Sequence, residues 1–177
     1  AQFFHLLRRQ MLQDHRTPLV VFTPKSLLRA KQSRSPVADL LSGTFEELLP
    51  DRTVEDPESV KRLVLCSGKV AVDAEAERDR LGVPVAIARV EQLYPWPFDA
   101  VAAELARYPN ATEIVWLQEE PENMGPWNAI KGRLYERHED THKIRRASRF
   151  ESGSPACGSA KVHAQEHAEL LAKALTG

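Results

Sequence analysis

The sequence predicts an α/β domain with a doubly wound, mostly parallel sheet that carries helices on both faces. Short runs of apolar and β-branched residues alternate with amphipathic segments of helical length. The apolar runs are nearly continuous, as in strands that are buried on both faces. Glycine, proline and asparagine fall between the segments, where the chain must turn. This alternation favours parallel strands joined by crossover helices.

The first winding begins with a strand predicted at 61–66, KRLVLC. The tripeptide SGK at 67–69 forms a turn, and a helix is predicted over 70–81. Gly82 then ends this helix, because glycine tolerates the left-handed conformation at helix ends. The remaining segments follow in order: strand 84–90, loop 91–97, helix 98–108, strand 113–117, helix 127–138, strand 143–149, loop 152–159 and helix 160–175.

The residues before this pattern are less regular. Apolar residues at helical spacing predict a helix over 2–14, and the run LVVF predicts a short buried strand over 18–23. Another amphipathic segment covers 36–49. The acidic, proline-bounded stretch 50–57 has the composition of a linker, so a domain boundary is predicted there. Because the chain opens inside an amphipathic pattern, we expect it to be the end of something longer.

Composition excludes several functions. The chain has 177 residues, 42% hydrophobic residues and a formal net charge of -1. Such a balance does not indicate a nucleic-acid or membrane partner, and no apolar run approaches the roughly 18 residues that span a bilayer. The first residues do not form a signal peptide. Cys66 and Cys157 are therefore expected to be free thiols in a reducing cytoplasm.

Basic residues offer two candidate anion sites. Lys69 lies between a predicted strand and a helix, where free backbone N–H groups attract anions. One glycine does not make a Walker A loop, so a plain tight turn is favoured. Lys25, Arg29, Lys31 and Arg34 form a basic run that suits the phosphates of a nucleotide or coenzyme A. Solvation, or contact with an acidic partner, explains that run equally well.

Two adjacent carboxylates, Glu119 and Glu120, follow the third predicted strand in the stretch WLQEEPENMGPW. Neighbouring acids shift each other's pKa values, which suits acid–base chemistry. Successive residues of an extended segment point to opposite sides, however, so the two acids need not share a site. We therefore favour a structural strand-to-helix junction that also contains Asn123 and Trp127.

Two histidines of the last predicted helix, His163 and His167, lie four residues apart and share a face. This is metal-ligand spacing, but the sequence HAQEH is not HExxH and offers no third ligand. A solvated helix face is favoured, and no metal site is expected. No GxSxG, GxGxxG or Cys/His signature occurs either, so no catalytic or cofactor-binding residue is assigned.

Several stretches taken together resemble the C-terminal end of the E1 component of 2-oxoglutarate dehydrogenase, a thiamin diphosphate-dependent family. The resemblance covers residues 3–175, and its most specific motifs are RxEQLYPxP and QEEPxNxGxW. The stretches occur in this order: FHLLRRQ, PLVVFTPKSLLR, VLCSGKV, RVEQLYPWP, WLQEEPENMGPW and SPACGSAKVHAQE.

The resemblance implies a domain plan. Residues 1–24 would be the last helix and strand of a pyrimidine-binding domain, 25–60 a connector, and 61–177 a transketolase-type C-terminal domain. In the family this last domain supports the dimer and supplies few reacting groups. Mg²⁺ and thiamin diphosphate would be bound by residues outside this chain, and the cofactor would carry the chemistry.

The implied enzyme is a cytoplasmic oxidoreductase of the tricarboxylic acid cycle. It decarboxylates 2-oxoglutarate and passes the succinyl group to the lipoyl-bearing E2 partner, and it works as a homodimer with a second E1 subunit. Some relatives respond to acetyl-CoA or AMP, for which Lys25, Arg29 and Lys69 are candidate phosphate contacts. Two other functions remain open: a freestanding module that binds a nucleotide or acyl-CoA, and a dimerisation domain without a ligand.

Overall fold

The computed structural model describes all 177 residues. The chain divides into two compact units, Ala1–Glu46 and Glu47–Gly177. The stretch 50–57, predicted to be a linker, thus lies inside the second unit. It belongs there because a short strand just before it pairs with the sheet, and because Asp51 is buried. The assignment of 1–24 and 25–60 to a pyrimidine-binding domain and a connector stays a prediction.

The second unit is built on a five-stranded sheet with the order β1-β3-β2-β4-β5. β1 runs antiparallel to β3, and the other three pairs are parallel. The strands are β1 Leu48–Leu49, β2 Arg62–Cys66, β3 Val85–Val90, β4 Glu113–Pro121 and β5 Lys143–Arg149. The four long strands lie where the sequence predicts them, whereas β1 was not predicted as a strand.

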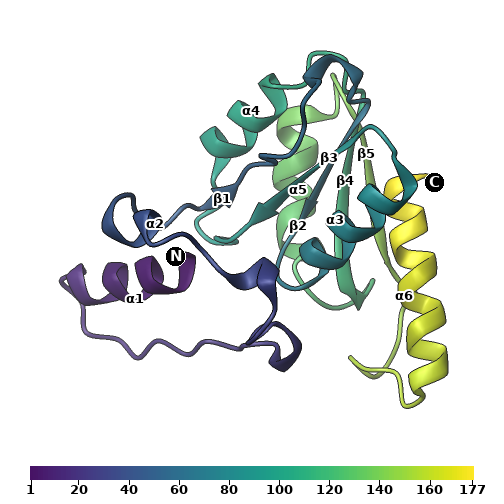
Figure 1. Ribbon diagram of the computed structural model, residues 1–177. Coiled ribbons are helices and arrows are strands. Elements are labelled where there is room, and N and C mark those ends of the chain that lie inside the picture. The colour runs from purple at the N-terminus through teal and green to yellow at the C-terminus, as the bar shows by residue number, and fades with distance from the viewer. The chain divides into compact units, whose positions relative to one another are not determined.

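Helices cover both faces of the sheet, α3 and α6 on one and α4 and α5 on the other (Figure 1). The helices are α3 Val70–Leu81, α4 Phe98–Ala106, α5 Trp127–His138 and α6 Ala160–Leu175, and the 3-10 helix η3 covers Pro57–Ser59. The predicted doubly wound α/β fold is confirmed. No helix of the structure has the length and apolar character that crossing a membrane requires.

The central strands send alternate residues into two separate cores. On β2, Leu63 and Leu65 pack with α4 and α5, while Val64 and Cys66 pack with α3 and α6. Trp116 of β4 is fully buried in the first core. The central strands are buried on both faces by the two cores, which explains why their sequences are nearly unbroken apolar runs.

The winding reverses beside β2. From β2 the chain steps to β3 on one side, then crosses back to β4 on the other side. In doubly wound folds the loops that follow two such strands separate, and the crevice between them is where ligands bind. A ligand site is therefore expected at the loops after β2 and β4.

β4 is longer than predicted. It continues to Pro121 with a register shift after Leu117, so Glu119 and Glu120 belong to a strand and not to a loop. The extension forms because β5 runs alongside: Pro121 pairs with Arg149, and the Glu122 amide donates to the Arg149 carbonyl over 3.0 Å. An apolar pattern cannot reveal such an extension, because its residues are polar.

The first unit consists of α1 Gln2–Leu12, the 3-10 helices η1 Lys25–Leu27 and η2 Lys31–Ser33, and α2 Ala38–Leu41. The buried His5 ring lies 2.7 Å by Nε2 from the Asp39 carbonyl oxygen. Gln2 exchanges two hydrogen bonds with the Glu46 backbone, of 2.8 and 2.9 Å. These contacts hold α1, which confirms the predicted first helix, against residues 39–46.

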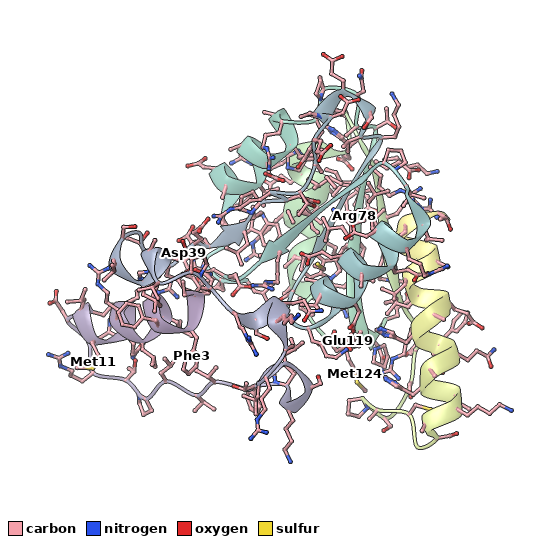
Figure 2. The ribbon with its side chains drawn as sticks, in the orientation of Figure 1. Phe3, Met11, Asp39, Arg78, Glu119 and Met124 are labelled. Atoms are coloured by element: carbon pink, nitrogen blue, oxygen red, sulfur yellow. The ribbon has the colours of Figure 1, made fainter.

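The strand predicted at 18–23 is absent, and Phe22 of this segment is 94% exposed. A strand needs a hydrogen-bonded neighbour, and none of the five strands pairs with this segment. One face of α1 is also exposed, as Phe3 and Met11 show in Figure 2. The first unit thus leaves large apolar side chains uncovered.

Candidate functional site at the carboxyl ends of the strands

The turn after β2 lets the chain pass from strand to helix. Gly68 has φ 77°, a left-handed conformation in which a side chain would be strained. Lys69 then begins α3 as its N-cap residue, without a capping hydrogen bond from its side chain. The predicted tight turn is confirmed, and it places Lys69 between the end of β2 and the start of α3.

The Lys69 ammonium is already paired. It contacts the carboxylate of Asp73, one turn further along α3, and both side chains are partly buried. A phosphate at Lys69 would have to compete with this carboxylate. Lys25 and Arg29 lie exposed in the first unit, and a shared phosphate site with Lys69 stays a prediction.

Three potential ligand groups converge beside Lys69. Asp73 comes from α3, Glu119 from the end of β4, and His167 from α6. One atom of each lies within 4.8 Å of the others, and all three residues are half-buried. The His167 Nε2 atom is 3.3 Å from the Asp73 carboxylate. We call Asp73, Glu119 and His167 the switch-point cluster.

Glu119 and Glu120 face opposite sides, as the strand geometry predicts. Glu119 joins the switch-point cluster and accepts a hydrogen bond at its carbonyl from Arg149 Nε over 2.7 Å. Glu120 lies against Gly125, where a Cβ atom would come within 3.0 Å of the Glu120 side chain. Gly125 also has φ 68°, so both space and backbone conformation favour glycine there.

The loop after β4 is anchored by Gln118, which sequence reasoning missed. Its buried amide oxygen accepts from the Trp116 indole and from the Trp127 backbone N–H, each over 3.0 Å. Its nitrogen donates to the carbonyls of Pro121 and Met124, over 3.1 and 2.8 Å. One side chain therefore fixes the end of β4 to the start of α5. Figure 2 places Glu119 and Met124 at this end of the sheet.

The other predicted junction residues contact neighbouring loops. Asn123 donates to the Ser152 carbonyl over 3.0 Å and accepts from the Ser152 amide over 3.2 Å. Trp127 is 6% exposed, and the Arg146 guanidinium lies 5.7 Å from its ring centroid. A structural role for Glu119, Glu120, Asn123 and Trp127 stays a prediction, but their contacts agree with it.

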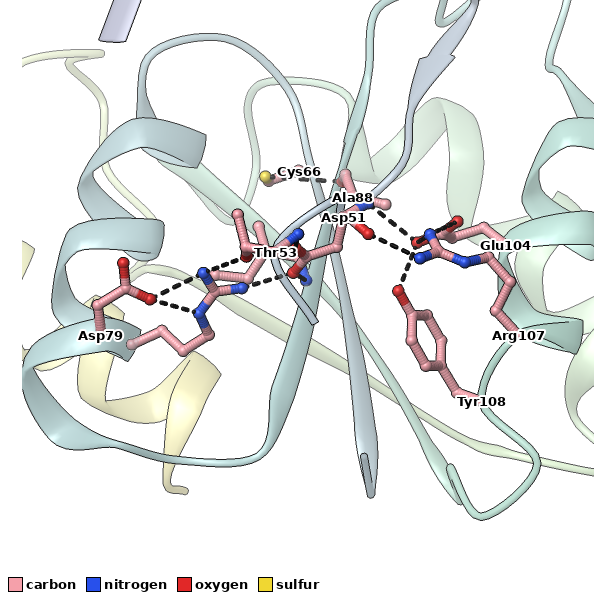
Figure 3. A network of polar contacts seen from close by, with 10 residues as sticks. Asp51, Thr53, Cys66, Asp79, Ala88, Glu104, Arg107 and Tyr108 are labelled. Carbon is pink, nitrogen blue, oxygen red and sulfur yellow. Dashed lines mark hydrogen bonds and ion pairs between the residues drawn. The ribbon is translucent and has the colours of Figure 1, made fainter. Parts of the chain in front are cut away.

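A second polar group lies inside the unit, around Asp51 (Figure 3). The Asp51 carboxylate accepts from Arg78 of α3, from the Thr53 backbone and hydroxyl, and from the Ile87 amide. Burial opposes the charge of Arg78, but the hydrogen bond to Asp79 and the charge of Asp51 raise its pKa. This network clamps the segment that follows β1 between α3 and β3.

The same network continues to α4. The Glu104 carboxylate accepts from the Asp51 amide over 3.1 Å, the Tyr108 hydroxyl over 2.8 Å and the Arg107 guanidinium over 2.9 Å. Burial, together with the hydrogen bond to Glu104, raises the pKa of Tyr108. We call Asp51, Arg78, Glu104, Arg107 and Tyr108 the buried network. Local sequence patterns do not reveal it, because its members lie on α3, in or just after α4, and in the predicted linker.

The chemistry available at the strand ends is ligation, not nucleophilic attack. Cys66 ends β2, but burial raises the pKa of its thiol to about 12 and keeps it protonated at neutral pH. The switch-point cluster and Lys69 bring together two carboxylates, an imidazole and a paired ammonium group. This set could hold a cation, and it suits a diphosphate poorly because its carboxylates repel negative charge.

These features define the class of the protein: a doubly wound α/β domain with a cluster of half-buried polar groups at the carboxyl ends of parallel strands. Residues 34–175 match the family model described as 2-oxoglutarate dehydrogenase C-terminal. The chain belongs to this family, and the resemblance that the ordered stretches predict is confirmed.

Individual relatives cover nearly the whole chain. A Cupriavidus necator protein named 2-oxoglutarate dehydrogenase E1 component is 48% identical over 172 residues, 97% of this chain and 18% of the relative. A Caenorhabditis briggsae protein named 2-oxoglutarate dehydrogenase, mitochondrial, is 44% identical over 98% of the chain and 17% of the relative. The mouse 2-oxoadipate dehydrogenase complex component E1 is 40% identical over 99% of this chain and 19% of the relative. The chain thus spans under a fifth of the length of these curated relatives.

Proposed function

We propose that this chain is the C-terminal segment of an E1 enzyme that decarboxylates 2-oxoglutarate and transfers the succinyl group to a lipoyl-bearing E2. The observation that carries the proposal is the 48% identity, over 97% of the chain, to a protein named as this E1 component. Within that enzyme the segment acts as scaffold and subunit contact.

The packing of the second unit supports the scaffold role. Its polar groups at the β4–α5 junction are joined by hydrogen bonds centred on Gln118, and its thiol at the end of β2 is buried. The apolar side chains exposed in the first unit, such as Phe3, Met11 and Phe22, suit burial against the rest of the E1 chain or a second E1 subunit, since large apolar patches mark contact surfaces.

The cofactors of the proposed enzyme are thiamin diphosphate and Mg²⁺, bound outside this chain. Thiamin diphosphate supplies the carbanion-stabilising chemistry of decarboxylation when bound. The switch-point cluster of this unit, with the carboxylates of Asp73 and Glu119, does not fit the diphosphate of this cofactor, so no step is assigned to it. Acetyl-CoA or AMP as effectors at Lys25, Arg29 and Lys69, and a cytoplasmic location, belong to the same proposal.

The keto acid can be tested directly. The complete polypeptide that contains this chain is assayed with thiamin diphosphate, Mg²⁺ and an artificial electron acceptor, on 2-oxoglutarate and on 2-oxoadipate. We expect turnover of 2-oxoglutarate, and none by the 177-residue chain alone. Preference for 2-oxoadipate would redirect the proposal toward the mouse relative's named substrate, and activity of the short chain would contradict the scaffold role.

The competing function is a freestanding module that binds a nucleotide or acyl-CoA at the strand ends. Titration calorimetry with acetyl-CoA and with AMP separates this possibility from a dimerisation domain without a ligand. Heat that disappears in Lys69→Ala would support a phosphate contact at the turn. No heat at millimolar ligand would count against any effector site.

A further inference from the structure

The switch-point cluster combines an imidazole nitrogen with two carboxylates. His167 shares its helix face with His163, but the sequence offers that pair no third ligand. The fold supplies two, because α3 and the end of β4 bring Asp73 and Glu119 within 4.8 Å of His167. Imidazole nitrogen and carboxylate oxygen are both Zn²⁺ ligands, and three protein ligands is the number found in open zinc sites, in which water takes the remaining position.

The donors are held in place by their elements. Asp73 is in the first turn of α3. Glu119 is in β4, and its backbone carbonyl accepts a hydrogen bond from Arg149. The His167 ring stacks on His163 with centroids 5.9 Å apart and an interplanar angle of 25°. Metal affinity depends on such orientation of the ligands by their surroundings.

The cluster already attracts one cation. The Lys69 ammonium contacts the Asp73 carboxylate, and its side chain is 31% exposed. A bound metal ion would displace this ammonium, which has solvent beside it to enter. Lys69 therefore competes with a metal, and removing its charge should favour metal binding.

We propose that Asp73, Glu119 and His167 form a binding site for a first-row divalent cation, represented by Zn²⁺. Imidazole suits Zn²⁺ better than Mg²⁺, because Mg²⁺ prefers oxygen ligands and keeps its waters. The ion would join three elements, α3, β4 and α6, at the carboxyl end of β4. It would keep an open coordination position for water or an anionic ligand. This inference goes beyond the proposed function, and its test does not depend on enzyme activity.

The test measures Zn²⁺ binding to the complete polypeptide saturated with Mg²⁺ and thiamin diphosphate, by competition with a chromophoric chelator. We expect one Zn²⁺ to bind per chain. Its affinity should fall by at least about tenfold in His167→Ala, Asp73→Asn and Glu119→Gln, since even residues that only orient the ligands contribute this much. Far-UV circular dichroism checks that each variant remains folded.

Two further variants keep the test decisive. Lys69→Gln should bind Zn²⁺ about fivefold more tightly, the effect of removing one nearby unit charge in water; a gain in affinity cannot arise from misfolding. His142→Ala is the matched control, because His138 and His142 on the α5 side also lie four residues apart, with ring centroids 6.2 Å apart, but outside the cluster. It should leave binding unchanged. Equal affinity in the wild type and His167→Ala, or no gain in Lys69→Gln, would overturn the site.

Discussion

The buried network and the switch-point cluster are built from the same kinds of side chain, but they differ in burial. In the network, Asp51, Arg78 and Glu104 are at most 7% exposed, and each carboxylate accepts several hydrogen bonds. In the cluster, Asp73, Glu119 and His167 are half-buried and border solvent. A polar group that is both enclosed and saturated has no capacity left for a ligand, so only the cluster is a candidate site.

The difference also predicts opposite energetics. Removing one partner of a buried charge pair strongly lowers the stability of the protein, because the other charge is left unpaired in a low dielectric. Removing one partner of a pair that borders solvent changes the stability little, because water solvates the remaining charge. Stability measurements on variants of each region therefore test this difference.

The largest expected effect is that of Arg78→Met in the buried network. It leaves the Asp51 carboxylate without its cation and should lower the free energy of unfolding by about 3–5 kcal/mol. Urea-induced unfolding followed by circular dichroism measures this. Arg80→Met is the control, because Arg80 is 66% exposed and pairs only with Glu77; it should change stability by about 0.5 kcal/mol or less. Equal losses in the two variants would show that the network is not tightly enclosed.

Gln118→Leu should have the next largest effect. Gln118 is 2% exposed, and its loss leaves the Trp116 indole and the Trp127 amide without their acceptor. A buried unsatisfied polar group costs about 1–3 kcal/mol. Thermal unfolding measures the loss, and Gln165→Leu, at an exposed position of α6, is the control. If Gln118→Leu is neutral, the junction is not fixed by this amide.

A pH effect is expected at the opposite, amino end of the sheet. Burial opposes the ionisation of Glu113, but the hydrogen bond from Arg62 and the charges of Arg62, Arg145 and Lys143 outweigh it and lower the pKa of this carboxyl group from its ordinary value. A carboxyl group with a lowered folded-state pKa stabilises the protein above its unfolded pKa, and this contribution disappears as pH falls through the folded pKa.

The free energy of unfolding of the wild type should therefore exceed that of Glu113→Gln by about 1 kcal/mol at pH 7. The difference should shrink as the pH falls below the ordinary glutamate pKa of about 4.3. Urea unfolding of both proteins at a series of pH values measures it. A difference that stays constant over this range would mean that Glu113 is not held ionised by its basic neighbours.

The smallest effect is predicted for Asp73→Asn in the switch-point cluster without added metal. Its pair with Lys69 borders solvent, with side chains 26% and 31% exposed, so the stability should change by less than about 1 kcal/mol. Thermal unfolding in the presence of a chelator measures this. A loss as large as that of Arg78→Met would place Asp73 in the structural core and weaken the case for a ligand site.

The candidate site was only partly predictable. The sequence indicated Lys69 at a turn and Glu119 at a strand end, because local patterns mark where strands stop. It could not join Asp73 to His167, which are far apart in the chain and meet only when α3 and α6 pack on one face of the sheet. It also missed Gln118, because a polar residue after an apolar run looks like the start of a loop.

By itself, the sequence determined the alternation of strands and helices, and with it the doubly wound fold, since apolar periodicity and glycine or proline breaks are local properties. Its ordered motifs also determined the family. The tertiary structure alone decided the pairing of β1 with β3, the extension of β4 and the absence of a strand at 18–23. Each depends on whether a hydrogen-bonding neighbour is present. It also decided which polar groups are enclosed and which face solvent, because burial is a property of packed elements and not of any one segment.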